Sequence, residues 1–326
     1  MTEKIEISHR TIIFTVLFLI GLGLLYQIRE ILVTLFVSLI LMSAINPTVD
    51  RLEKFHLPRW LAILIPYLAI ILIVGGMMAM MITPLIEQTA SFINKSIFYL
   101  KDVGNFGIDP NMVASQLNQL GSIPANIVRI TMNFFSNLIA IIALFFMTFY
   151  LLLERKNLNH YLIAIFGDGK EKDALMIVNN IEKRLGGWVR GELTLMVIIG
   201  LMSYIGLRLL GVEFALPLVI LAGLLEILPN IGPVISAIPA VLTGLMISPM
   251  MALAILALYF LIHQSENTLI TPKVMQKVVG INPLVTILSL AIGFKLAGVS
   301  GAILAIPVVL VIQEIATWFL ASKKSS

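Results

Sequence analysis

Long stretches of apolar, almost uncharged residues recur along the whole chain and limit what it can fold into. Nine of them lie near residues 11–28, 31–46, 60–83, 131–153, 193–210, 215–248, 250–262, 284–297 and 300–320. Several reach the ~20 residues that a helix needs to cross the hydrocarbon core of a bilayer. Charged residues make up 12% of the chain, against about 25% in a soluble globular protein. The sequence therefore predicts an all-α, polytopic membrane protein, with residues 1–326 forming a single integral membrane domain.

The Lys and Arg residues are distributed unevenly between the two sides of the predicted membrane helices. Sixteen of the 22 lie in the N-terminal tail, in 47–59, 155–190 and 271–277, or at the C-terminus. Five lie on the opposite side, and Lys295 is inside an apolar stretch. Because positively charged loops stay in the cytoplasm, both termini are predicted to be cytoplasmic. We therefore attribute the net charge of +4 to the basic residues that orient the chain in the membrane. We expect no nucleic acid partner.

Two regions between the apolar stretches have the periodicity of amphipathic helices. In the outer-side region at 84–128, apolar residues from Ile86 to Leu100 recur at spacings of four and three. In the cytoplasmic region at 154–191, an apolar stripe runs from Leu175 to Val189. Either region could lie in the membrane interface, bind a partner, or pack on helices of its own chain.

Two apolar segments repeat one another. "PLVILAGLLEILPNIGPVISAIPAVL" at 217–242 and "PLVTILSLAIGFKLAGVSGAILAIPVVL" at 283–310 both start Pro-Leu-Val, break at a glycine-containing tip and return through Ala-Ile-Pro-x-Val-Leu. Arms of about 12 residues cover only ~18 Å as helix, less than the ~30 Å hydrocarbon thickness. We therefore predict two broken, re-entrant-like hairpins of opposite orientation, at 215–248 and 283–320. The alternative is a chance similarity between apolar sequences, with 215–248 forming one kinked span or two.

The tips of the two hairpins are the predicted transport pathway. Irregular backbone at that depth is tolerated only where protein buries it or water reaches it. Helix N-termini near Pro233 and Ser300 would favour an anionic or oxygen-rich solute. The tip residues that we predict to border the pathway are Pro229, Asn230, Gly232, Pro233, Gly298, Ser300 and Gly301.

Two ionisable residues inside apolar stretches complete this list of candidates. Glu226 follows Pro217 by nine residues and Lys295 follows Pro283 by twelve, so both approach a tip. Ionisable groups at such depth are functional candidates, because they are costly to keep there. Each could bind solute, carry a proton, or pair with the other across the hairpins. A structural ion pair, or a Lys295 that reaches back to the interface, is the alternative.

Other polar residues are secondary candidates. His263, Glu266 and Asn267 lie within about one helical turn and could form half of a metal site or a proton relay. Arg190 and Glu192 lie at one end of the predicted 193–210 helix, where interfacial anchoring is the simpler role. The chain has four scattered His, no Cys, and none of the motifs HExxH, P-loop or GxSxG. We expect no metal, no cofactor and no enzymatic activity.

Five segments together resemble the autoinducer-2 exporter (AI-2E) family of transporters. They are "NPTVDRLEKFHLPRW", "GWVRGEL", "LPNIGPVISAIPAVL", "SENTLITPKVMQKVVGINPL" and "GVSGAILAIPVVLVIQEI". The resemblance covers nearly the whole chain and is most specific from 187 to 310. The chain departs from the family pattern at Asn230, where an aromatic residue is expected.

The resemblance implies a multi-span permease with about eight membrane segments, in the cytoplasmic membrane of a prokaryote and in a homo-oligomer. The implied activity is secondary transport of a small polar solute such as autoinducer-2. Exchange of sodium or lithium for protons is the alternative within the family. An oligomeric channel or a membrane scaffold are alternatives from other classes, and the absence of an ATP-binding motif disfavours a primary pump.

Overall fold

The described part of the chain is built from helices, with no strand in it. The computed structural model describes residues 9–103, 138–167, 171–212, 215–229, 231–275 and 280–325. The elements are α1 (His9–Gln27), α2 (Arg29–Glu53), α3 (Arg59–Val103), α6 (Leu138–Glu154), η2 (Arg155–Asn157), α7 (Leu158–Phe166), α8 (Glu171–Leu209), α9 (Ala215–Leu225), α10 (Gly232–Ile247), α11 (Pro249–Ser265), η3 (Glu266–Ile270), α12 (Thr271–Met275) and α13 (Pro283–Ser325).

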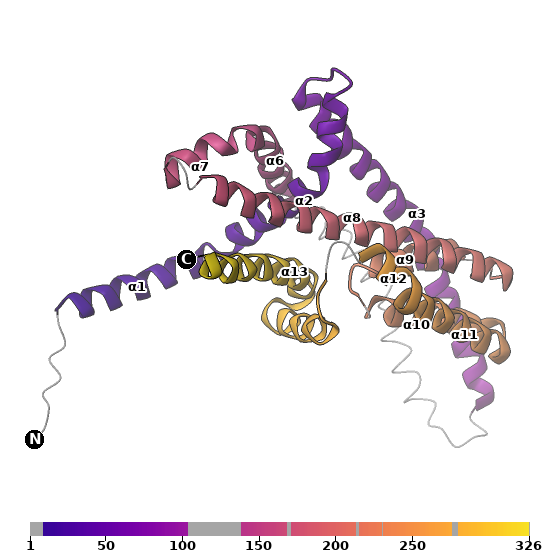
Figure 1. Cartoon of the computed structure of the whole chain (residues 1–326). Coiled ribbons are helices and arrows are strands. Elements are labelled where there is room, and N and C mark those ends of the chain that lie inside the picture. Colours follow the sequence, from indigo (N-terminus) through magenta and orange to yellow (C-terminus); the bar gives the residue numbers. More distant parts are fainter. Residues whose placement is uncertain are drawn as a thin grey trace, which may run out of the picture.

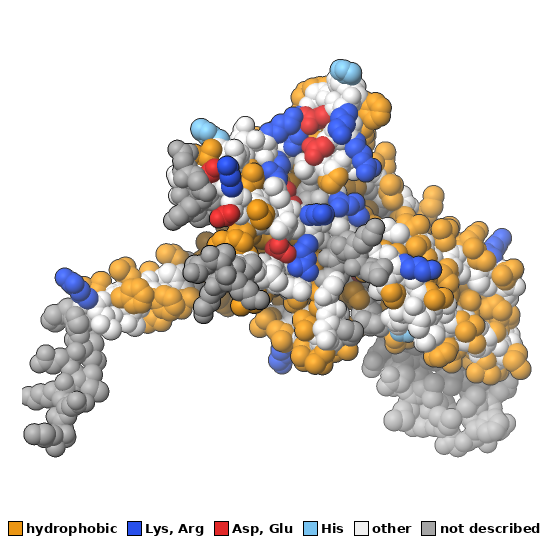
Figure 2. Space-filling view, in the orientation of Figure 1, with side chains coloured by type: hydrophobic (Ala, Val, Ile, Leu, Met, Phe, Trp, Pro, Cys, Tyr) orange, Lys and Arg blue, Asp and Glu red, His pale blue; other side chains and the backbone are white. Residues whose placement is uncertain are grey.

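Six helical segments in the described ranges are long and apolar enough to cross a membrane. They are Arg29–Glu53, Arg59–Met77, Leu138–Ile165, Glu171–Leu209, Pro249–Met275 and Leu284–Leu320. Three shorter apolar helices accompany them, namely Ile13–Gln27, α9 and α10. Large apolar side chains cover much of the visible face, as expected of a surface that lipid covers (Figure 2). The prediction of an all-α, polytopic membrane protein is confirmed.

Helix α8 is the central element, and α2, α7, α9, α11, α12 and α13 pack on successive parts of it (Figure 1). Near its start it contacts α2 and α13, around Leu185 and Trp188. Nearer its end it contacts α9 and α11, around Leu207. Because lipid is as apolar as leucine, close packing rather than removal from water holds such helices together. The helix α1 extends away from this body toward the N-terminus (Figure 1).

The first repeated segment is a pair of short helices separated by a break. Helix α9 ends at Leu225, irregular chain follows, and α10 begins at Gly232. The break is closed by backbone hydrogen bonds from Leu228 N to the Leu225 oxygen, 3.0 Å, and from Gly232 N to the Leu228 oxygen, 2.8 Å. A Cβ atom at Gly232 would collide with the Leu225 carbonyl, so this close turn requires glycine.

The second repeated segment breaks inside α13. Ala297 (φ −142°) and Gly298 (φ 62°, ψ −143°) leave the helical conformation, and the second of these is accessible mainly to glycine. The two arms then lie against each other, because a Cβ atom at Gly293 or at Gly301 would collide with the carbonyl oxygen of the other residue. Both segments thus have the helix–break–helix form that the repeat predicts.

The two broken segments also contact one another. Leu228, in the break between α9 and α10, packs in one buried cluster with Leu290, Ala302 and Ala305 of α13. These three residues flank the α13 break on both arms. The first break therefore rests against the second pair of arms.

The structure describes only part of the first predicted amphipathic region and most of the second. Helix α3 continues through 84–103, and the remainder of the outer-side region, 104–128, lies outside the described residues. The region at 154–191, predicted to be cytoplasmic, contains η2, α7 and the first half of α8. Its apolar stripe packs on the chain's own helices, since Ile181, Leu185 and Val189 contact residues of α2 and α13.

Candidate functional site

Three glutamates from separate elements are buried together in the described structure. Glu192 is 4% exposed, Glu226 is 1% exposed and Glu266 is 3% exposed. The carboxyl group of Glu226 lies beside that of Glu266, and Glu192 is near enough to interact electrostatically with both. No Lys or Arg forms an ion pair with any of the three within the described ranges. Acidic side chains are rarely buried without a cationic partner, so this cluster is the candidate site.

The local fold explains how each carboxyl group reaches this place. Glu192 lies on the buried stripe of α8, in register with Leu195 and Ile199. Glu226 is the first residue after α9, where the helix breaks ahead of Pro229. Glu266 opens the π-helical turn η3 between α11 and α12. Such turns widen a helix locally and occur frequently at functional sites.

Two oxygens of this cluster have no hydrogen-bond partner. They are Oε1 of Glu192 and Oε2 of Glu226, both fully enclosed. Almost all buried polar atoms in folded proteins have a partner, so an unpaired carboxylate oxygen calls for an explanation. The site thus offers oxygen ligands and negative charge to a proton or a small cation.

A short polar chain connects this cluster to the surface at η3. His263 Nδ1 lies 3.4 Å from Oε2 of Glu266, and Nδ2 of Asn267 lies 3.1 Å from Nε2 of His263. Asn267 is exposed, His263 is half-buried and Glu266 is buried. Because imidazole can both donate and accept a proton, this order suits a relay between the surface and the buried acids.

The predicted pair of His263 and Glu266 does not extend to a metal centre. Within the described residues, no group of three or more His, Cys, Asp or Glu side chains is arranged to hold a metal ion. The buried acids therefore form no closed cage for a resident ion. A transported ion needs only a transient set of ligands.

The structure separates Glu226 from the other charged candidate of the hairpins. Lys295 is exposed on the first arm of α13, whereas Glu226 is enclosed with Glu192 and Glu266. The structure thus brings together the acid of one hairpin with acids of α8 and η3, and it does not bring that acid to the lysine of the other hairpin.

The predicted tip residues are in varied surroundings. Gly232 and Pro233 are buried at the start of α10, Pro229 is half-buried, and Asn230 lies outside the described residues. The N-terminus of α10 has no side-chain cap.

On the other hairpin, Gly298 and Gly301 are partly buried and Ser300 is exposed. The Ser300 hydroxyl donates to the Ala297 carbonyl oxygen at 2.8 Å and thereby closes the break.

The prediction that Arg190 and Glu192 lie at a helix end is wrong, because α8 is continuous from Glu171 to Leu209. Arg190 is exposed, and its Nη1 atom donates to the carbonyl oxygens of Ser43, 3.5 Å, and Ala44, 3.3 Å, on α2. Glu192, on the opposite side of the helix, faces the buried acids. Sequence reasoning missed its role because the apolar stripe from Leu175 was followed only to Val189. Continued at the same spacing, the stripe reaches Glu192.

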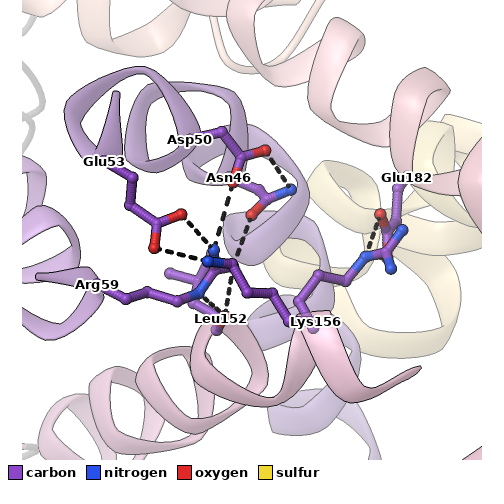
Figure 3. Close-up of polar contacts among 8 residues, drawn as sticks. Asn46, Asp50, Glu53, Arg59, Leu152, Lys156 and Glu182 are labelled. Atoms are coloured by element: carbon purple, nitrogen blue, oxygen red, sulfur yellow. Dashed lines mark hydrogen bonds and ion pairs between the residues drawn. The ribbon is translucent and has the colours of Figure 1, made fainter. Parts of the chain in front are cut away.

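A second polar cluster lies at the junction of α2, α3 and α6, where charged side chains gather on the visible face (Figure 2). Arg59 donates from Nε and Nη2 to the Leu152 carbonyl oxygen, at 2.9 and 2.7 Å, and pairs with Glu53 at 2.8 Å (Figure 3). Lys156 pairs with the same glutamate at 2.9 Å. The bonds to Leu152 satisfy the end of α6, which would otherwise leave its carbonyl groups unpaired.

A nearby ion pair joins Arg155 to Glu182 of α8 at 2.7 Å (Figure 3). The surrounding cavity of about 350 Å³ is lined by Asn46, Asp50, Arg59, Arg155, Lys156, Asn159, Leu175 and Asn179. Its cations are balanced by neighbouring carboxylates, so the cluster serves to join helices. It also brings together the regions 47–59 and 155–190, which the charge distribution predicts to share one side of the membrane.

Comparison with known proteins agrees with the features described above. Residues 12–320 match the family model described as AI-2E family transporter. YueF of Bacillus subtilis, named as a transport protein, is 29% identical over 84% of this chain and 80% of its own. YrrI of the same organism, also named for transport, is 25% identical over 90% of this chain and 88% of its own. A sodium-lithium/proton antiporter of Halobacillus andaensis is 23% identical over 86% of this chain and 87% of its own.

Proposed function

Because the chain belongs to the AI-2E transporter family, we propose that it is a secondary transporter that exchanges Na⁺ or Li⁺ for protons across the cytoplasmic membrane of a prokaryote. The observation that carries this proposal is the contact between the buried carboxyl groups of Glu226 and Glu266, with no Lys or Arg paired to them in the described ranges.

The chemistry of this contact suits exchange. Two bare carboxylates side by side repel each other strongly in a medium of low dielectric constant. They stay together when they hold either a shared proton or a small cation between them. The two occupants exclude each other because they neutralise the same charge. A site of this kind binds one ion on one side of the membrane and releases it for the other, which is the requirement for antiport.

The position of the site supports the same function. Glu226 lies at the break of a discontinuous helix, and secondary transporters commonly build ion sites from such breaks and their free carbonyl groups. The similarity to the Halobacillus andaensis antiporter, which extends over most of both chains, gives independent support.

The test is ion exchange by the purified protein in liposomes. An imposed pH gradient is followed with an internal pH dye while Na⁺, Li⁺, K⁺ or choline is added outside. We expect Na⁺ or Li⁺ to dissipate the gradient with saturation, and choline to have no effect. Cation movement without any proton movement would indicate a channel. No movement of any solute by correctly inserted protein would favour a scaffold.

A second candidate is export of a hydroxylated solute such as autoinducer-2. The observation that favours it is the N-terminus of α10, where Gly232 and Pro233 begin the helix without a side-chain cap. The partial positive charge at this end of the helix would favour the oxygens of such a solute. The same liposomes loaded with labelled autoinducer distinguish the exporter from the cation antiporter. Only the exporter is expected to release the label when a proton gradient is imposed. We also propose that the working unit is a homo-oligomer, which cross-linking in native membranes would test.

A further inference from the structure

Buried polar atoms without partners are concentrated in one part of the molecule. Besides the oxygens of Glu192 and Glu226, the described residues contain three such atoms, all hydroxyl oxygens: Ser203 Oγ, Tyr259 OH and Thr271 Oγ1. All five atoms belong to α8, to the break after α9, or to the continuous run from α11 to α12. These are the elements that carry the three buried acids.

Ser203 lies on the same face of α8 as Glu192. The two residues are 11 positions apart, which in an α-helix places them about 20° apart around the axis and ~16 Å apart along it. Leu195 and Ile199 lie between them on the same buried stripe. Ser203 itself has no exposed surface. The Ser203 hydroxyl thus lies on the same face of α8 as the Glu192 carboxyl group, closer to the C-terminal end of the helix.

Tyr259 has the equivalent position on α11. It precedes Glu266 by seven residues, which again places the two about 20° apart around the helix and ~10 Å apart along it. Ile255 and Ile262 belong to the same buried stripe. Tyr259 is 5% exposed and packs among apolar side chains, including Leu218 of α9.

Helices α8 and α11 pack against each other close to these two residues. A Cβ atom at Gly206 of α8 would collide with the side chain of Leu258 on α11. The two helices run in opposite directions, because α11 returns the chain after α9 and α10. Ser203 and Tyr259 therefore lie on the same side of the acid cluster, toward the end of α8 near Arg208 that the charge distribution predicts to be outside.

A hydroxyl in this position is costly if the contact between α8 and α11 is permanent. Phenylalanine in place of Tyr259, and alanine in place of Ser203, would fill nearly the same space without burying an unpaired polar atom. The hydroxyls become favourable when the contact opens and water or a cation reaches them, since each offers an oxygen ligand in an otherwise apolar wall.

From this we propose that the seam between α8 and α11, marked by Ser203 and Tyr259, is the outer half of the ion path to the buried acids. It takes a small hydrated alkali cation and is closed in the conformation described here. This inference rests on the proposed function, because it supplies the route by which ions reach Glu226 and Glu266.

The first test uses the absence of cysteine in the natural sequence. The variant Ser203→Cys is compared with Leu201→Cys, which lies two residues away, is 57% exposed and faces the lipid side of α8. Both are treated in sealed vesicles with a membrane-impermeant cationic thiol reagent, added on the side opposite the termini. We expect Ser203→Cys to react roughly tenfold faster than the control, because only the seam is reached by water during transport. Saturating Li⁺ or Na⁺ should slow that reaction.

The second test replaces the tyrosine hydroxyl alone. We expect Tyr259→Phe to raise the half-saturating Li⁺ or Na⁺ concentration for exchange roughly fivefold, which corresponds to the loss of one hydrogen-bonding ligand. Tyr204→Phe, on a partly exposed tyrosine of α8, is the matched control and should behave like the natural protein.

The two proposals can fail separately. If the natural protein exchanges ions but Ser203→Cys is unreactive and Tyr259→Phe is unchanged, the seam is a permanent packing contact and the inferred path is wrong. If Ser203→Cys reacts but no Na⁺ or Li⁺ exchange occurs, the seam opens to water while the proposed function is wrong, and the assignment of an alkali cation to the path fails with it.

Discussion

Replacing Glu226 by Gln is expected to reduce Na⁺- or Li⁺-driven proton movement about 100-fold or more, because an uncharged amide cannot balance a cation next to Glu266. The substitution keeps the size of the side chain and places no charge in the buried cluster. The protein should therefore insert in the membrane and remain folded. The measurement is the initial rate of pH-gradient dissipation in liposomes that contain equal amounts of each variant.

The control for this substitution is Glu30→Gln, which removes an exposed carboxylate at the start of α2. It should leave the rate unchanged. Glu266→Gln should resemble Glu226→Gln, since either amide destroys the carboxyl pair. Exchange at the natural rate by both variants would remove the pair from the mechanism.

The second large effect is expected at the break of α13. Gly301→Ala places a methyl group against the carbonyl oxygen of Gly293, where neither backbone can move without separating the two arms. Forced overpacking of this kind costs about 1–3 kcal/mol, and contact with backbone rather than a flexible side chain puts the expected loss near the upper end. The measurement is the midpoint of thermal unfolding in detergent.

Gly75→Ala is the matched control for that measurement. Gly75 lies in a membrane helix, within α3, and a Cβ atom there would meet nothing within 4 Å. Alanine is a better helix former than glycine, so this variant should be as stable as the natural protein or more stable by about 0.5–1 kcal/mol. Equal midpoints for the two variants would show that the arms of α13 do not pack as described.

The broken helices could be predicted from sequence because their causes are local. Pro229 and Gly232 interrupt one apolar segment, and Gly298 interrupts the other with a backbone conformation that suits glycine. Each arm is short because the first break lies between Pro217 and Pro239 and the second lies between Pro283 and Pro307. The burial of Glu226 followed from its position inside an apolar run.

The composition of the acid cluster could not be predicted, because it depends on tertiary contacts. Glu192, Glu226 and Glu266 are separated by 34 and 40 positions in the chain, and nothing in their local patterns indicates that they meet. The hypothesis that Lys295 pairs with Glu226 relied on the symmetry of the repeat. In the structure the partners of Glu226 come from α8 and η3, outside the repeat.

The burial of Glu192 was difficult to predict for a different reason. Hydropathy windows place a helix boundary where charged residues begin. Hydropathy therefore predicts that Arg190 and Glu192 lie at the end of a membrane span. In the structure, α8 continues through both residues, with one exposed and the other buried. Local composition does not distinguish a charged residue on the buried stripe of a long helix from one at a helix end. The two are distinguished by whether the residue falls at the spacing of the apolar stripe.

The most direct test of the central claim is proton release from the purified protein in weakly buffered detergent solution. If Glu226 and Glu266 hold either a proton or a small cation, adding Li⁺ or Na⁺ will release protons in a saturable manner. Choline will release none, and the release will be lost in Glu226→Gln. Absence of proton release from folded natural protein at saturating Li⁺ and Na⁺ would contradict the account.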